Sequence, residues 1–241
     1  MSPAWKKIAL LLAAGALAVL ATAPEPEASS AGGGAMVEIP DRTPVVALTF
    51  DDGPWPGTTE RLLDGLALRE TPATFFLVGV NIPGREALVR GMAAEGHQVG
   101  VHSYSHARIR GLSRADFDCE VGKVRAQLSA ILGGGEFWLR PPYGAMDDSV
   151  RLWADSPIIL WSVDPEDWKD DDVDRKTAHV LSHVRDGDII LFHDIFDSSV
   201  DAALRVVDAL EDQGYCFVTV EQLLARGDVQ AERGAVYRRL E

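Results

Sequence analysis

The sequence VVALTFDDGP at residues 45–54 carries the strongest indication of the fold. Residues 45–50 are apolar or β-branched, as is typical of a strand buried in a parallel sheet. Asp51 and Asp52 follow at once, and the Gly-Pro pair at 53–54 predicts a turn. Because parallel α/β folds carry functional groups at such strand ends, this stretch also indicates where a site is expected.

From this stretch onward, short apolar runs alternate with longer amphipathic ones, which predicts repeated strand–helix units. The predicted strands are 45–50, 73–78, 98–101, 137–140, 158–161, 188–192 and 216–220. The predicted helices are 58–69, 85–95, 113–132, 147–153, 174–184, 198–213 and 221–225. Such an α/β pattern fits either an open doubly wound sheet or an incomplete (β/α) barrel.

Composition favours one large folded domain. The chain has 241 residues, 46% of them hydrophobic and 25% charged, which are ordinary values for a globular protein. Its 23 Lys and Arg against 37 Asp and Glu give a net charge of −14. Nucleic acids and anionic membrane surfaces are therefore disfavoured as partners, because both attract basic proteins.

The N-terminus predicts export. Residues 1–23 combine Lys6 and Lys7 with an apolar run at 8–21 and the triplet Ala-Thr-Ala, as in a signal peptide or a retained N-terminal anchor. Residues 24–42 are expected to be a flexible linker, 43–226 the single catalytic domain, and 227–241 a C-terminal tail. A secreted or envelope-associated protein could join Cys119 to Cys216, but two separate buried thiols are the default expectation, because nothing in the sequence shows that the two residues meet.

Unusual polar residues follow five of the predicted strands. They are Asp51 and Asp52, His102 and His106, Arg140, Asp164, and His193. Since the carboxyl ends of parallel strands share one face, these side chains are expected to converge. Adjacent carboxylates point in different directions, so one of Asp51 and Asp52 is expected to bind and the other to react. On a helical turn, His102 and His106 would share a face, and two His with one carboxylate suit Zn²⁺ or a similar divalent ion.

The motifs TFDDGP (49–54), HSYSH (102–106), RPPYG (140–144), DPEDW (164–168) and LFH (191–193) occur in this order. Together they resemble the polysaccharide deacetylases with a NodB-homology domain, carbohydrate esterase family 4. The resemblance spans residues 43–226. It implies a distorted, incomplete (β/α)7–8 barrel, the second of the two architectures above.

The resemblance also implies residue roles. The implied metal ligands are Asp52, His102 and His106. Asp51 would be the general base, oriented by Arg140, and His193 the general acid, with its basicity tuned by Asp164. The oxyanion would be held by the metal and the backbone N–H of Tyr143. The implied substrate pocket consists of Trp168, Leu191, Pro141 and Tyr143. One divalent ion is expected, Zn²⁺ first, with Co²⁺ or another ion as alternatives.

The expected function is an exported, metal-dependent hydrolase that removes N-acetyl groups from N-acetylglucosamine-type residues of peptidoglycan or chitin-like oligomers. An acetylxylan or other carbohydrate O-acetyl esterase is the nearest alternative, because the same site can cleave esters. A non-catalytic carbohydrate-binding protein on the same scaffold is the alternative of another class. Substrate choice is expected in loops 55–57, 81–85 and 195–199, and the acidic residues of 164–174 outside the motif are expected to form a solvated loop.

Overall fold

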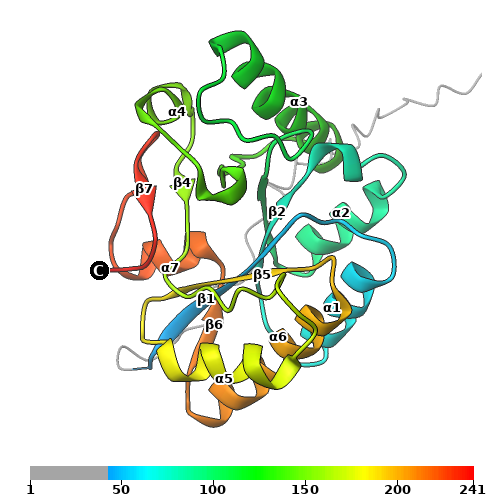
Figure 1. Ribbon diagram of the computed structural model, residues 1–241, viewed down its shortest axis with the longest axis vertical. Coiled ribbons are helices and arrows are strands. Elements are labelled where there is room, and N and C mark those ends of the chain that lie inside the picture. Colours follow the sequence, from blue (N-terminus) through cyan, green and yellow to red (C-terminus); the bar gives the residue numbers. More distant parts are fainter. Residues whose placement is uncertain (1–42) are drawn as a thin grey trace, which may run out of the picture. The chain divides into compact units, whose positions relative to one another are not determined.

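The strand predicted from the opening motif is the centre of the sheet. Residues 43–241 are described by the computed structural model in Figure 1. All seven residues of β1 (Val45–Asp51) are buried. One edge of β1 pairs in parallel with β5 (Ile189–His193). The other edge is shared by β6 (Cys216–Val218) along its first half and β2 (Thr74–Leu77) along its second.

The sheet continues from β2 to β3 (Gln98–Val101), again in parallel. The strand predicted at 137–140 is reduced to the single residue Leu139, which bridges Val101 on one side and Ile158 on the other. Pro141 and Pro142 directly follow this segment and have no N–H to donate, which explains why the pairing stops there. Strand β4 (Ile158–Ile159) then pairs with β7 (Val236–Tyr237).

Closure of the sheet runs through the segment 158–163. Ile158 bridges Leu139 beside β3, and Val163 at the other end bridges Ile190 of β5. Single bridges thus connect the two sides of the sheet where regular strands would stand in a complete barrel. The architecture is a distorted, incomplete α/β barrel, which confirms the prediction drawn from the family resemblance.

Helices connect the strands along the outside of the barrel (Figure 1). They are α1 (Thr58–Ala67), α2 (Glu86–Ala94), α3 (Arg114–Leu132), α4 (Asp148–Trp153), α5 (Val173–His183), α6 (Asp197–Asp212) and α7 (Val220–Arg226), with 3-10 turns η1 (Gly79–Asn81) and η2 (Pro142–Gly144). Helix α6 packs against α1 and α5, and α2 packs against α3. Ser113 caps α3 by accepting the N–H of Asp116 at 3.2 Å, a contact typical of helix starts.

The C-terminal residues, expected to be a tail, belong to the fold. Strand β7 covers the free edge of β4, an edge that would otherwise leave backbone groups unpaired. The Leu240 N–H donates to the Gly187 carbonyl at 2.7 Å. A Cβ atom at Gly227 would lie 2.2 Å from Leu240 Cδ1, so the Leu240 side chain packs directly on that glycine.

Cys119 and Cys216 are both free thiols. Within residues 43–241, no helix is both long and apolar enough to cross a membrane. The predicted signal peptide or anchor at 1–23 and the predicted linker at 24–42 lie outside the described residues.

Candidate metal and acid–base site

Asp51 and Asp52 have different main partners, as their adjacency predicts, although both carboxylates also lie near His102. Asp51 is the last residue of β1 and is 2% exposed. Asp52 has φ 80°, the left-handed conformation that non-glycine residues rarely adopt. This turn directs the Asp51 carboxylate to Arg140 and that of Asp52 to His102 and His106. Backbone strain of this kind is concentrated at functional sites.

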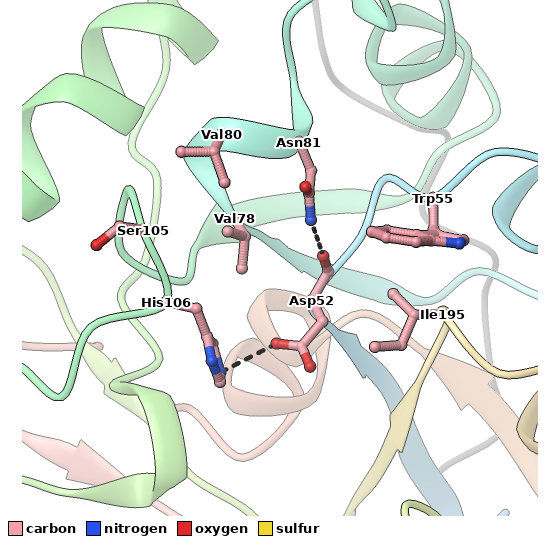
Figure 2. A pocket seen from close by; sticks show the side chains of 8 residues that line it. All are labelled: Asp52, Trp55, Val78, Val80, Asn81, Ser105, His106 and Ile195. Atoms are coloured by element: carbon pink, nitrogen blue, oxygen red, sulfur yellow. Dashed lines mark hydrogen bonds and ion pairs between the residues drawn. The ribbon is translucent and has the colours of Figure 1, made fainter.

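Asp52, His102 and His106 form a group that can hold a metal ion, their ligand atoms lying within 4.8 Å of one another. The Asp52 Oδ1 atom is 3.2 Å from His106 Nε2, the ion pair drawn in Figure 2. It is 3.5 Å from His102 Nε2. This oxygen is buried and has no hydrogen-bond donor, a costly state that a bound cation would relieve. The donor set of one carboxylate and two imidazoles therefore fits a divalent ion.

The two histidines lie on a loop after β3, not on the helical turn that their spacing suggests. Ser103 and His106 both have positive φ, 59° and 58°, which bends the loop so that both rings face Asp52. His102 Nδ1 lies 2.8 Å from the Arg140 carbonyl, and His106 Nδ1 lies 3.3 Å from the Tyr143 hydroxyl. With Nδ1 of each ring engaged on the outside, Nε2 is directed toward Asp52.

Arg140 is fully buried and holds Asp51. Its Nη1 donates to Asp51 Oδ1 and to Thr49 Oγ1, both at 2.8 Å, while Nη2 donates to the Leu160 carbonyl. Its guanidinium also lies 4.2 Å from the ring centre of Phe76. Burial, the largest influence, would raise the pKa of Asp51, but the charges of Arg140, His102 and His193 together outweigh it and the pKa is lowered. Asp51 is thus held as a carboxylate.

His193 pairs with Asp167, whereas the predicted partner was Asp164. The backbone N–H and Nδ1 of His193 both donate to the Asp167 carboxylate, at 2.8 and 2.7 Å. Burial would lower the pKa of His193, but the hydrogen bond and charge of Asp167 raise it to about 9. His193 is therefore protonated at neutral pH, with Nε2 outside this pair.

Asp164 shapes the turn that brings Asp167 to His193. Its Oδ1 accepts the N–H of Glu166, which has φ 51°, and the chain then reverses. Asp167, a member of the DPEDW motif for which no role was predicted, is 1% exposed. The family resemblance implied Asp164 as the partner of His193, and no local pattern marks Asp167, three residues further on, as the acid that is buried.

The structure adds a buried carboxylic acid that the motifs did not indicate. Asp194 follows His193, is fully buried, and accepts the Thr59 hydroxyl proton at 2.6 Å. Burial raises its pKa to about 7. A Cβ on Gly53 would lie 2.1 Å from Asp194 Oδ2, so Asp194 packs directly beneath the loop after β1.

The residues predicted to line an acetyl pocket divide into two pairs. Trp168 and Tyr143 are 56% and 60% exposed, whereas Leu191 and Pro141 are buried. Trp168 directly follows the buried Asp167, and Leu191 lies on β5 opposite Thr49. Tyr143 has φ 62° and its ring lies 5.0 Å from the guanidinium of Arg108.

The fold and the site together define a class of protein. It is an α/β-barrel protein in which a group able to hold a metal ion lies beside a buried carboxylate and a protonated histidine. A family model described as polysaccharide deacetylase matches residues 38–156. The chain is 36% identical over 196 residues to the chitooligosaccharide deacetylase of Sinorhizobium fredii, covering 74% of this chain and 91% of that protein. The chain belongs to the polysaccharide deacetylase family.

Further similarities agree with this membership. The chain is 42% identical over 180 residues to the peptidoglycan-N-acetylmuramic acid deacetylase PdaC of Bacillus subtilis, covering 74% of this chain but only 38% of that protein. It therefore spans well under half the length of that relative. Among solved structures, the T48 deacetylase with substrate has TM-score 0.77 and 39% identity, covering 81% of this chain and 96% of that one. The family 4 acetyl xylan esterase from Clostridium thermocellum with a cobalt ion has TM-score 0.78 and 28% identity, covering 81% and 98%.

Proposed function

We propose that this protein is a divalent-metal-dependent deacetylase that hydrolyses N-acetyl groups on N-acetylglucosamine-type residues of peptidoglycan or chitin-like oligomers. The observation that carries the proposal is the meeting of three groups at one end of the barrel. These are the Asp52–His102–His106 cluster, the Asp51 carboxylate held by Arg140, and the His193–Asp167 pair. The names of the relatives and neighbours, which include peptidoglycan and chitooligosaccharide deacetylases, support the substrate class.

Each protein group has a distinct task in this mechanism. Asp51, ionised beside Arg140, accepts a proton from the attacking water. His193, protonated because of Asp167, donates a proton to the nitrogen as the amide C–N bond breaks, so that acetate and a free amine are released. We assign the backbone N–H of Tyr143 to the developing oxyanion and the side chains of Trp168, Leu191 and Pro141 to the acetyl methyl group.

Asp52, His102 and His106 would hold the metal ion, and the neutral imidazole of His102, whose pKa is lowered by burial, suits this role. A divalent ion there supplies Lewis-acid polarisation and makes water a nucleophile near neutral pH. We propose Zn²⁺ as the ion, on the basis of the tetrahedral nitrogen and oxygen donors that zinc prefers. The cobalt ion named with the acetyl xylan esterase makes Co²⁺ the first alternative.

Ester cleavage is the second candidate function, because that esterase neighbour has a TM-score of 0.78. The N-terminal sequence supports export, and we place the working protein outside the cytoplasm, secreted or bound to the envelope.

The test is acetate release by the full chain from N-acetylglucosamine oligomers, peptidoglycan and acetylxylan, after chelation and after restoring Zn²⁺ or Co²⁺. We expect metal-restored release from the amino-sugar substrates and its loss in Asp51→Asn. Release from acetylxylan alone would assign the protein to the esterases. Glycan binding without release from any substrate would favour the non-catalytic alternative.

A further inference from the structure

A pocket of about 220 Å³ opens directly beside the metal-ligand group (Figure 2). It is built from the loops after β1, β2, β3 and β5, and its lining residues are Asp52, Trp55, Val78, Val80, Asn81, Ser105, His106 and Ile195. The three loops in which the sequence places substrate choice each contribute a side chain to it, namely Trp55, Asn81 and Ile195. The pocket is therefore a meeting point of these three loops and the metal ligands.

The backbone of Trp55 is anchored, and the residue is 46% exposed. Its N–H donates to Thr59 Oγ1 at 2.8 Å, and its carbonyl accepts the Thr59 N–H at 3.1 Å. The Thr59 hydroxyl is in turn anchored on the buried Asp194. Figure 2 shows the indole on the same side of the pocket as Asn81 and Ile195. A large aromatic ring left open to solvent on an anchored backbone is typical of a binding surface.

We propose that this pocket binds the sugar ring next to the one that carries the scissile acetyl group, with Trp55 stacked on the face of that neighbouring ring. This inference rests on the proposed function. The pocket includes the ligands Asp52 and His106 but neither Asp51 nor His193, the proposed base and acid. Its occupant therefore contacts the metal-ligand edge of the reacting centre but neither the proposed base nor the proposed acid.

The size and chemistry of the pocket fit one neutral pyranose ring. A volume of about 220 Å³ is below the range of about 300–1,000 Å³ that drug-sized ligands occupy. A glucose-configured ring has C–H groups on both faces and hydroxyls on its rim. Trp55, Val80 and Ile195 suit the faces, and the polar side chains of Asn81 and Ser105 suit the rim. Neither Lys nor Arg is among the described residues that line the pocket, so it offers no cationic partner for an anionic substituent.

The test compares Trp55→Ala and Trp55→Phe with wild type, as full chains loaded with Zn²⁺. The substrates are the pentamer of N-acetylglucosamine and 4-nitrophenyl acetate, which has no sugar ring. We expect Trp55→Ala to raise KM for the pentamer about tenfold, equivalent to about 1.4 kcal/mol, with little change in kcat. Trp55→Phe should retain most of the affinity, and neither variant should alter hydrolysis of 4-nitrophenyl acetate.

The control variant is Leu68→Ala, because Leu68 is 85% exposed and lies at the opposite end of α1 from Trp55. Its kinetics should equal those of wild type with both substrates. Calorimetric binding of the N-acetylglucosamine pentamer in an Asp51→Asn background, with Trp55 intact or replaced by Ala, gives a readout that needs no catalysis. If wild type releases no acetate from amino sugars but binds this pentamer more tightly than Trp55→Ala, the proposed function fails and the stacking site stands.

Two results would overturn the stacking proposal. In one, Trp55→Ala binds the pentamer as wild type does and has an unchanged KM. In the other, it slows both substrates equally through kcat, which would make Trp55 a support for the loop that carries Asp52.

Discussion

Replacement of Asp167 by Asn tests the acid–base assignment most directly. Asp167 is 1% exposed and accepts two hydrogen bonds from His193. Without the carboxylate, the pKa of His193 should fall from about 9 to 6.5 or below, since burial alone opposes its charge. The difference corresponds to about 3 kcal/mol, at about 1.4 kcal/mol for each tenfold change in the proton equilibrium.

The assay is the pH dependence of kcat/KM for an N-acetylglucosamine oligomer, together with an NMR titration of the His193 ring. In wild type, activity should decline as pH rises through about 9, where the proposed acid loses its proton. In Asp167→Asn, the same decline should occur near pH 6.5 or below.

The free energy of unfolding should also depend on the protonation state of His193. Because the folded-state pKa of His193 is raised, its pairing with Asp167 contributes stability that is complete below pH 6.5 and is lost as pH rises through about 9. The difference in the free energy of unfolding in urea between wild type and Asp167→Asn should therefore be largest below pH 6.5. This difference should narrow above pH 9.

Asp164→Asn is the matched control, because Asp164 is the neighbouring acid that contacts the Glu166 N–H and not His193. In this variant, the decline in kcat/KM should still occur near pH 9. An unmoved His193 titration in Asp167→Asn, or an equal displacement in Asp164→Asn, would refute the reasoning.

Three further changes probe other parts of the structure. Replacing Arg140 by Met leaves the Asp51 carboxylate buried without its cation and should lower the free energy of unfolding in urea by about 3–5 kcal/mol; an unchanged midpoint would contradict this. Tyr143→Phe removes the hydroxyl that contacts His106 Nδ1 and should weaken Zn²⁺ binding about 10- to 100-fold in a chelator competition. Wild-type affinity in this variant would show that the contact does not orient the His106 ring. Deleting residues 227–241 removes β7 and should lower the free energy of unfolding by at least about 1 kcal/mol, or Tm by about 2–4 °C in calorimetry. An unaltered Tm would mean that β4 needs no partner strand.

Local patterns were sufficient for most of the elements. The buried run at 45–50 is the centre of the sheet, and the Ser113 cap begins α3 where the spacing to Asp116 predicts. These features depend on neighbours within a few residues, so they can be read from the chain. The pairing of the segment at 137–140 could not be read from the chain, because it depends on how closely Val101 and Ile158 approach this segment.

The sequence by itself determined the strand ends and hence the polar groups that gather there, because parallel strands bring their carboxyl ends to one face. It also determined that Asp51 and Asp52 diverge, since adjacent side chains cannot share a direction. Only the tertiary structure decided that Asp167 and not Asp164 reaches His193, that Trp55 stands beside the metal ligands, and that residues 227–241 cover β4. Each of these depends on distances between segments far apart in the chain, which turns and packing set and which no local pattern records.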